Sequence, residues 1–404
     1  MLTYRLLVTL LAGAELAKRL WARDGQALRA RLGLLRPDHA AGRIWLHAAS
    51  NGELASVRPV IDALLADGRH LLITVNTDSA LQMANGWGLT KTDVHLAPVD
   101  LPGPTRRTLR NWRITAHVTL ESDLWPRRIL DTPGPVLVLG GRLTARSAKG
   151  WARFDSLVRR VMARISYLSA QDAASAKRFL EAGLPQSALG PVFDLKALYA
   201  PPPDQPDTTL TKAFDRTETW LAASTHEGED DILLTAHKTA LVQRPALKLI
   251  IAPRHPRRAD DVARRIEAHG LTGARRSSGD DPASAQVYLA DTLGEMHLWY
   301  ALAGVTFVAG SLTDRGGHTP YEPAAFKSAI LHGPDTGNFR AAYDRLTEAD
   351  AALCTPDAAA IADALVTLNR AEKQANLGQA AQDALDQDTD FEGLMRDITH
   401  VLDA

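Results

Sequence analysis

The sequence predicts an α/β protein built from two Rossmann-like domains, and three observations support this prediction. Apolar segments of strand length alternate with amphipathic segments of helical length, which is typical of parallel sheets covered by helices on both faces. The alternation stops at a proline-rich stretch and then starts again. The 404 residues, 45% hydrophobic and 23% charged, are enough for two or three soluble domains.

Net charge and cysteine content exclude several classes of function. A formal net charge of −1 provides no field that would favour nucleic acid as a partner. With Cys354 as its one cysteine, a single chain has neither a disulfide framework nor a cysteine zinc site, and a reducing compartment fits. The thirteen histidines are scattered, and no pattern indicates a metal site or an obligate protein partner.

Residues 1–36 are predicted to form a membrane-associating segment. The apolar stretch from Leu6 to Ala17 is too short to span a bilayer, which takes about 20 apolar residues, and it lacks a clear signal-peptide cleavage site. Seven basic residues against two acidic ones give this segment a local net charge of +5, and Trp21 lies between its apolar and basic parts. The pattern favours a helix lying in an anionic membrane surface. A packing helix with a solvated basic face is the alternative.

The first domain is predicted over residues 37–196. Its strands are expected at residues 43–50, 70–77, 94–100, 116–122, 135–141 and 165–172. Its clearest helices are expected at residues 51–68, 78–88 and 173–183, the first of them ending at Gly68.

A linker is predicted at residues 197–216, because four prolines within residues 201–206 suit neither a helix nor a central strand. The second domain follows at residues 217–385. Its strands are expected at residues 219–225, 247–254, 285–291, 305–311 and 329–335, and its helices at 227–243, 260–270, 295–304 and 321–329. Residues 386–404 are expected to form a closing helix, and whether it packs back on the first domain stays open.

Most polar clusters come directly after a predicted strand. They lie at residues 47–53, 121–126, 224–229, 253–258, 291–295 and 310–323. The carboxyl ends of parallel strands meet at one edge of a sheet, where ligands bind in such folds. The sequence therefore predicts a site in the cleft between two facing domains.

Two of these clusters suit an anionic ligand. Ser224 and Thr225 are expected at the start of a helix, where hydroxyls cap and backbone N–H groups bind anions. The acidic residues that follow are equally consistent with an ordinary helix start. Arg254 follows an apolar strand and suits a phosphate, although a solvated basic loop would give the same pattern.

The segment "SLTDRGGHTPYEP" at residues 311–323 suits a sugar nucleotide. Gly316 and Gly317 allow the backbone to approach a ligand closely. Glu322 is expected at a helix start, where its carboxylate can accept two hydrogen bonds from a ribose. The alternative is that Glu322 only complements the helix dipole.

These motifs carry a resemblance that covers nearly the whole chain. The sequence resembles the 3-deoxy-D-manno-octulosonic acid (Kdo) transferases of lipopolysaccharide synthesis. The strings that carry it are "WLHAASNGE", "APVDLPGPTRRTLRNWR", "ESDLWP", "GGRLTARSAKGW", "STHEGE", "APRHP", "DTLGEM", "AGSLTDRGGHTPYEPAAF" and "GPDTGNF". The resemblance implies the GT-B fold, in which two Rossmann-like domains face each other across a cleft.

The resemblance also implies the reaction. Kdo would move with inversion from CMP-Kdo to a lipid A precursor, at the cytoplasmic face of the inner membrane and without metal or cofactor. Glu53 would be the catalytic base, which agrees with its place beside Gly52 in the first strand–helix loop. From the residues alone, Glu53 could equally be a first-turn helix acid. Glu121 would line the acceptor side, and Arg142 would stabilise negative charge there.

The resemblance also implies which residues bind the nucleotide. The residues implied to contact CMP-Kdo are Pro253, Arg254, Leu293, Gly294, Glu295, Ser311, Thr319, Pro320, Tyr321 and Glu322. Among them, Glu322 is the expected ribose partner, with the helix start facing the phosphate.

The sequence departs from the family pattern at Asn51, Asp123, Ala309 and Thr319, and the family's lysine has no clean match near Lys196. Two alternatives therefore stay open beside a Kdo transferase. One is a diverged relative with a changed sugar or acceptor, and the other is a catalytically silent relative that binds a nucleotide. Retention of Glu53 argues against the silent relative.

Overall fold

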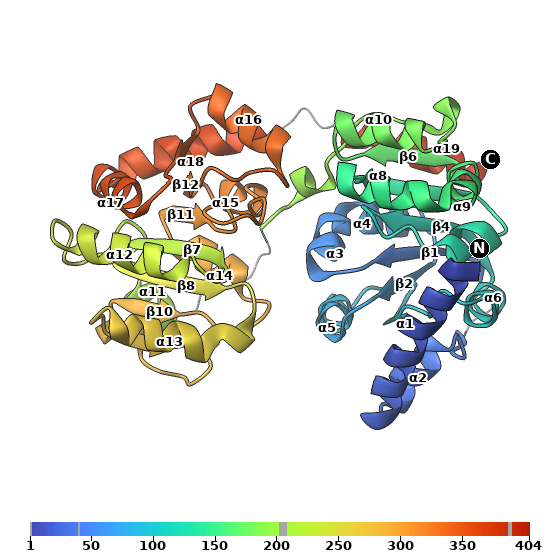
Figure 1. Ribbon diagram of the computed structural model, residues 1–404, viewed down its shortest axis with the longest axis horizontal. Coiled ribbons are helices and arrows are strands. Elements are labelled where there is room, and N and C mark those ends of the chain that lie inside the picture. Colours follow the sequence, from blue (N-terminus) through green and yellow to red (C-terminus); the bar gives the residue numbers. More distant parts are fainter. Residues whose placement is uncertain (1, 39–40, 202–207, 387–389) are drawn as a thin grey trace. The chain divides into compact units, whose positions relative to one another are not determined.

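The computed structural model of the protein describes residues 2–38, 41–201, 208–386 and 390–404. The chain forms two compact units (Figure 1). Unit 1 comprises Met1–Leu198 and Thr389–Ala404, and unit 2 comprises Tyr199–Asp388. Residues 202–207, which include most of the predicted proline-rich linker motif, lie outside the described residues.

Unit 1 contains a six-stranded parallel sheet with the strand order β3-β2-β1-β4-β5-β6. Its strands are β1 (Arg43–Ala48), β2 (Leu71–Val75), β3 (Thr92–Leu96), β4 (Ile114–Leu120), β5 (Val136–Gly141) and β6 (Tyr167–Ala170). This is the strand order of a Rossmann fold, and the order reverses between β1 and β4. Both strands are apolar along most of their length because helices cover both faces of the sheet.

The helices of unit 1 are α1 (Leu2–Trp21), α2 (Gly25–Arg31), α3 (Asn51–Ser56), α4 (Arg58–Ala66), α5 (Asp78–Gly86), α6 (Pro102–Asn111), α7 (Pro126–Asp131), α8 (Ala145–Trp151), α9 (Asp155–Met162), α10 (Ala173–Glu181) and α19 (Phe391–Asp403). The single helix predicted at residues 51–68 is wrong, since α3 and α4 are separated at Val57. Pro59 explains the break, because it has no N–H to donate to the carbonyl four residues earlier.

The C-terminal helix α19 packs within unit 1. Leu394 and Ile398 are buried in the same apolar core as β1 and β2. The Tyr167 hydroxyl donates to Asp397 at 3.2 Å, and Arg69 pairs with Asp403 at 2.8 Å. The end of the chain therefore completes the core of the unit in which the chain begins.

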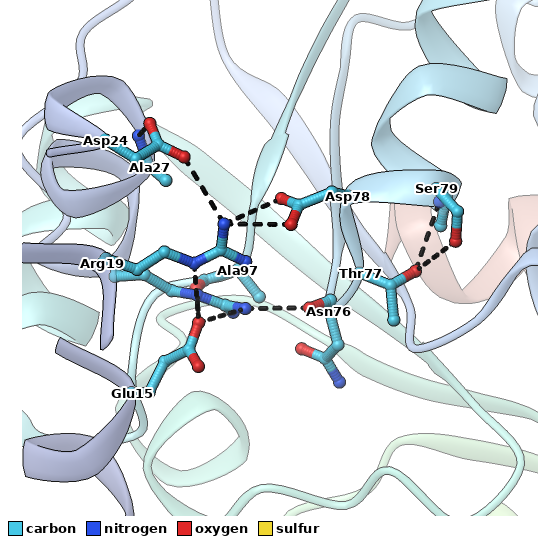
Figure 2. A network of polar contacts seen from close by, with 11 residues as sticks. Glu15, Arg19, Asp24, Ala27, Asn76, Thr77, Asp78, Ser79 and Ala97 are labelled. Carbon is cyan, nitrogen blue, oxygen red and sulfur yellow. Dashed lines mark hydrogen bonds and ion pairs between the residues drawn. The ribbon is translucent and has the colours of Figure 1, made fainter. Parts of the chain in front are cut away.

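Helix α1 is fixed to unit 1 by a network of ion pairs (Figure 2). Arg19 contacts Glu15, Asp24 and Asp78, the last at 3.0 Å. Arg31 donates to Glu15 and to the backbone carbonyls of residues 76 and 97. Arg19 and Arg31 are both buried. Their charges are balanced by acidic partners that include Glu15 and Asp24.

The network leaves one side of α1 apolar and exposed. Leu6, Leu10 and Leu20 are 58%, 69% and 67% exposed, and Trp21 is 90% exposed. None of the helices in the described part of the chain is long and apolar enough to cross a membrane.

Unit 2 contains a seven-stranded parallel sheet with the strand order β13-β12-β11-β7-β8-β10-β9. Its strands are β7 (Thr219–Thr225), β8 (Lys248–Pro253), β9 (Gly273–Arg275), β10 (Val287–Leu289), β11 (Val305–Val308), β12 (Ala329–His332) and β13 (Ala352–Cys354). The sequence did not predict β9 and β13, since these edge strands have three residues each and carry no buried apolar run.

The helices of unit 2 are α11 (Thr208–Ala213), α12 (Asp230–Leu241), α13 (Ala259–Ala268), α14 (Met296–Leu302), α15 (Tyr321–Ala325), α16 (Arg340–Glu348), α17 (Ala358–Thr367) and α18 (Ala371–Leu385). Alternate residues of β7 face two different apolar clusters: Trp220 lies in one and Leu221 in the other. Helix α11 lies within the predicted linker 197–216. Its Leu210 is buried in the second cluster, so this part of the segment belongs to the domain.

Candidate active site

Glu53 lies in the first turn of α3, directly after β1 and beside the strand-order reversal of unit 1. Ser50 caps this helix by accepting a hydrogen bond from the Glu53 N–H at 3.3 Å. The Glu53 carboxylate in turn accepts from the Ala49 N–H at 2.8 Å and faces the Ser50 hydroxyl at 3.5 Å. This arrangement is close to a capping box, so the first-turn role that the sequence left open is present in the structure.

The surroundings of Glu53 also make its carboxyl group a base near neutral pH. Burial, followed by the negative charge of Glu121, raises its pKa to about 7, and the charge of Asp123 acts in the same direction. The hydrogen bond from Ala49 and the charge of Lys196 oppose this shift. A carboxyl group with such a pKa can accept a proton from a hydroxyl at physiological pH.

Asp123 is held by a buried chain of hydrogen bonds that starts on β1. The Trp45 Nε1–H can only donate, and it does so to Thr74 Oγ1 at 2.8 Å. The ionised Asp123 carboxylate can only accept, so His47 Nε2–H donates to Asp123 Oδ2 at 2.5 Å. The other nitrogen of the neutral imidazole, Nδ1, therefore accepts from the Thr74 hydroxyl at 2.9 Å. The directions of the bonds follow from the indole donor at one end of the chain and the carboxylate acceptor at the other.

The same contacts keep Asp123 negatively charged. Burial by itself would raise its pKa, but the hydrogen bond from His47 and the charge of Arg128, with the Trp125 N–H, lower it to about 2. Burial lowers the pKa of His47 to about 4, so this histidine is a neutral donor at pH 7. Asp123 therefore contributes a fixed negative charge beside Glu53.

Glu121 and Arg142 complete this edge of the sheet in unit 1. Glu121 follows β4 with a positive φ of 47°, and its carboxylate pairs with Lys196 Nζ at 2.8 Å. The Arg142 N–H donates to the Glu121 carbonyl at 3.1 Å, which joins the loops after β4 and β5. The carboxylates of Glu53, Glu121 and Asp123 form the carboxylate cluster of unit 1. Lys196, for which the sequence gave no clean family match, lies in this cluster.

The corresponding edge of unit 2 is organised by Glu229. Its carboxylate is fully buried and accepts four backbone hydrogen bonds. One oxygen accepts from Ser311 and Leu312, both at 3.1 Å, and the other accepts from Gly310 at 2.8 Å and His226 at 2.9 Å. Glu229 therefore fixes the loop that follows β11 against the loop that follows β7.

The predicted helix cap at Ser224 and Thr225 is wrong. Both residues belong to β7, and Ser224 has a positive φ of 62°. Helix α12 begins only at Asp230, and the Thr225 hydroxyl donates to the Asp230 carboxylate at 2.8 Å. The turn at residues 226–229, with Gly228 at a φ of 95°, separates the strand from the helix.

The Ser311 hydroxyl is used inside the domain, and any contact of this residue with a ligand stays a prediction. It is fully buried, donates to the Val308 carbonyl at 2.6 Å and accepts from the Gly333 N–H at 2.8 Å. A hydroxyl has one proton to donate, and here that proton serves the fold.

Gly316 and Gly317 are required by the protein itself. Both have positive φ values, 78° and 68°. A Cβ on Gly316 would lie 2.6 Å from the Asn338 side chain, and one on Gly317 would lie 2.9 Å from the Asp335 carbonyl. The close approach that the sequence predicted therefore takes place with residues 335–338, and any contact with a ligand stays a prediction.

Arg254 gives this edge of unit 2 a positive charge, which acts on the neighbouring His226 and His318. The backbone N–H of Arg254 donates to the Thr225 carbonyl at 3.0 Å. The Arg254 side chain is exposed and has no hydrogen-bond or ion-pair partner among the described residues. His226 and His318 face each other through their Nε2 atoms at 2.9 Å. Burial and the neighbouring His226 and Arg254 lower the pKa of His318 to about 4. An anion bound beside Arg254 would favour the charged forms of these histidines.

Other predicted nucleotide residues occupy two further loops of unit 2. Pro253 ends β8, and Leu293 and Gly294 lie in the loop before α14, where Leu293 is 65% exposed. Glu295 follows that loop directly before α14, and its carboxylate pairs with Arg276 at 2.7 Å. Their contact with a nucleotide stays a prediction.

The segment that contains Glu322 begins the short helix α15, which ends earlier than predicted. Pro320 precedes this helix, and the Tyr321 hydroxyl accepts from Arg345 at 2.7 Å. Glu322 lies near the Tyr300 hydroxyl. Burial, followed by the charge of Glu322, raises the pKa of that hydroxyl well above its ordinary value. The Thr319 hydroxyl oxygen is buried without a hydrogen-bond partner among the described residues.

Comparison with known proteins decides the family. The family model described as 3-deoxy-D-manno-octulosonic-acid transferase (kdotransferase) matches residues 26–198. A 3-deoxy-D-manno-octulosonic acid transferase of Haemophilus influenzae is 32% identical over 362 residues, which are 85% of this chain and 83% of that protein. The chain belongs to the Kdo transferase family. It is therefore an enzyme, a glycosyltransferase, as the resemblance implied.

One further relative agrees with this assignment, and one solved structure shows the fold. The 3-deoxy-D-manno-octulosonic acid transferase of Bordetella pertussis is 32% identical over 380 residues, which are 90% of this Kdo transferase family member and 88% of that protein. The structure of HepE from Anabaena in complex with UDP-glucose is 12% identical, has a TM-score of 0.60, and covers 90% of this chain and 100% of its own. At this identity the likeness concerns the fold alone, and it supports the predicted GT-B class of two parallel-sheet α/β domains.

Sequence reasoning did not assign a role to His47 or to Glu229. The one signal for His47 was a polar residue inside the buried strand "RIWLHA". Glu229 was interpreted as one of several helix-start acids, and no local pattern indicates a carboxylate that binds backbone N–H groups about 80 residues later in the chain.

Proposed function

We propose that this Kdo transferase family member moves Kdo with inversion from CMP-Kdo to the lipid A precursor lipid IVA, with Glu53 as the general base. The observation that carries the proposal is the Glu53 carboxyl group, whose pKa is raised to about 7 at the strand-order reversal of unit 1. An acceptor hydroxyl that attacks the sugar must lose its proton, and a base of this pKa can take it. The reaction is proposed to need no metal or cofactor, so transfer should persist in EDTA.

The neighbours of Glu53 have distinct roles in this proposal. Asp123 and Glu121 supply the negative charge that keeps Glu53 basic. Lys196 limits this effect and, through its 2.8 Å ion pair, holds Glu121 in place. Arg142 would stabilise negative charge on the acceptor side.

The donor is proposed to bind at the carboxyl edge of the sheet in unit 2. The Arg254 guanidinium would contact the phosphate of CMP-Kdo, because it is exposed and has no partner among the described residues. The Glu322 carboxylate would accept hydrogen bonds from the ribose hydroxyls. The buried, unpartnered Thr319 hydroxyl lies three residues before Glu322 and would face the same ligand.

A transfer assay tests the proposal directly. Purified protein would receive lipid IVA and CMP-Kdo generated in place, with products identified by mass spectrometry. A mass increase of one or more Kdo units is the expected result. If no product forms while CMP still binds, the alternatives gain weight, namely a relative with a changed sugar or acceptor, or a catalytically silent nucleotide-binding protein.

Replacing Glu322 by alanine should weaken CMP binding by about tenfold or more, because a ribose hydroxyl pair would lose a charged hydrogen-bond acceptor. Isothermal titration calorimetry with CMP measures the change. Glu348→Ala, at an exposed glutamate of α16, is the matched control and should bind as the unmodified protein does. Equal affinity in both variants would remove the ribose role of Glu322.

The enzyme is proposed to lie on the cytoplasmic face of the inner membrane through α1. The exposed side chains Leu6, Leu10, Leu20 and Trp21 suit the acyl boundary of a bilayer, and the exposed Lys18 suits anionic headgroups.

The variant Leu10→Glu/Trp21→Glu keeps the Arg19 network and should lose binding to vesicles that contain anionic lipid. Co-sedimentation measures this loss, with Val242→Glu, at an 83% exposed position of unit 2, as the control. Undiminished sedimentation of the double variant would contradict the membrane role of α1.

A further inference from the structure

Unit 1 contains an apolar pocket to which none of the assignments above gives a ligand. The pocket has a volume of about 230 Å³ and lies among α7, α8, α9 and the short 3₁₀ turn Ala152–Phe154. Its apolar lining includes Leu124, Trp125, Trp151, Phe154, Val158 and Met162. Apolar side chains thus surround a space that the core of the domain does not fill.

The pocket adjoins the carboxylate cluster. Ser122 and Asp123, which also line it, directly follow Glu121 after β4. Trp125 Nε1 donates to Asp123 Oδ1 at 2.7 Å, so one wall of the pocket is fixed to a residue whose charge acts on Glu53. A molecule that occupied the pocket would therefore have its remaining part near the proposed base.

Positive charge accompanies the apolar lining. Helix α8 ends at Trp151, which lines the pocket, and the same helix carries Arg146 and Lys149. Both cations are exposed, as is Arg153 in the following turn, and none of the three has an ion-pair partner among the described residues. An apolar hole beside unpaired cations suits a molecule with a hydrocarbon part and an anionic part.

We propose that this pocket binds one fatty acyl chain of the acceptor, with the cations of α8 and the following turn near its anionic headgroup. The inference rests on the proposed function, because it concerns the acceptor of that reaction. The volume is below the ~300–1,000 Å³ of sites that enclose a whole small molecule, which fits a single chain of a larger lipid. Binding in the pocket would place the headgroup beside Glu53 and would favour acylated acceptors.

The kinetic test fills the pocket with Val158→Phe. Val158 is half-buried and lines the pocket, so a larger ring should take the place of the chain. The KM for the acylated acceptor is expected to rise about tenfold, with the KM for CMP-Kdo unchanged and the KM for the chemically deacylated acceptor unchanged. Val242→Phe, at an exposed position of unit 2, is the matched control.

The outcomes separate this inference from the proposed function. If neither acceptor receives Kdo, the proposed function itself fails. If both are used and Val158→Phe behaves as Val242→Phe does, the enzyme transfers Kdo but the pocket does not bind an acyl chain.

A binding measurement tests the pocket in the unmodified protein without turnover. Brominated lauric acid, kept below its micelle concentration, should quench the tryptophan fluorescence of the unmodified protein, since Trp125 and Trp151 line the pocket. Val158→Phe should lower the quenching and Val242→Phe should leave it unchanged. Equal quenching in the two variants, or none in the unmodified protein, would overturn the proposal.

Discussion

Replacing Glu53 by glutamine is expected to lower turnover by about 10²–10⁴-fold, the range for loss of a general base. Glutamine keeps the size of the side chain and one hydrogen-bond acceptor for the Ala49 N–H, but it cannot take a proton. CMP affinity should not change, because Glu53 lies in unit 1 and the proposed nucleotide residues lie in unit 2. Steady-state kinetics and calorimetric titration with CMP measure the two quantities on the same preparation.

The pH dependence gives a second measure of Glu53. Its pKa is raised to about 7, so the carboxyl group is protonated and inactive as a base below this value. The turnover of the unmodified enzyme should therefore rise with pH through about 7 and level off above it. The residual turnover of Glu53→Gln should lack this rise. A rise that persists in the variant would assign the titration to another group.

Stability separates the two roles that the structure gives to Glu53. A carboxyl group with a raised pKa binds its proton more tightly in the folded state, so its ionisation destabilises the fold as the pH rises from about 4.5 through about 7. The uncharged glutamine avoids this loss. Above pH 7 the variant should therefore be more stable than the unmodified protein, by up to about 3 kcal/mol, with little difference at pH 4.5.

A residue that served only as a first-turn cap would behave in the opposite way. Its replacement would cost stability at every pH at which the carboxylate is charged. Thermal denaturation at pH 4.5 and pH 8 distinguishes the two cases. Glu181→Gln, at an exposed glutamate of α10, is the control that should show no such dependence on pH. If Glu53→Gln is less stable than the unmodified protein at pH 8, burial and nearby charge do not destabilise the ionised Glu53 carboxylate as proposed.

The sequence predicted most strands of both sheets because parallel strands are buried on both faces and are apolar along their length. The strand Thr219–Thr225, for example, has the bounds that the pattern indicated. The edge strands β9 and β13 carried no such pattern, since they are short and partly exposed. The break at Val57 was missed because the apolar spacing continues through it, and only the proline that follows marks the end of α3.

The candidate site was predicted as a set of loops but not as a set of contacts. Residues directly after β1 and β4 were expected to lie close together, and Glu53 and Asp123 do influence each other. The partners within the set were not predictable, because they depend on distances across the sheet. The ion pair between Lys196 and Glu121 joins residues 75 positions apart in the sequence. Gly316 and Gly317 were attributed to a ligand, although the loop at residues 335–338 already requires them.

Replacing Glu229 by glutamine should destabilise unit 2 by about 2–6 kcal/mol. Each carboxylate oxygen of Glu229 accepts two backbone N–H groups, at distances between 2.8 and 3.1 Å. An amide has one oxygen, so either orientation of glutamine leaves two buried N–H groups facing an NH₂ donor. Each unsatisfied buried donor costs about 1–3 kcal/mol. The loop after β11 should loosen first, since three of the four donors belong to residues 310–312.

Glu227→Gln is the matched control, because Glu227 lies in the same turn and is exposed. The same chemical change at that position should leave stability unchanged. Thermal denaturation measures the global effect, and hydrogen exchange of the amides of residues 310–312 measures the local one. If the proposed donor site depends on this loop, Glu229→Gln should also bind CMP more weakly than Glu227→Gln. Equal exchange rates in the two variants would show that the Glu229 carboxylate does not hold the loop after β11.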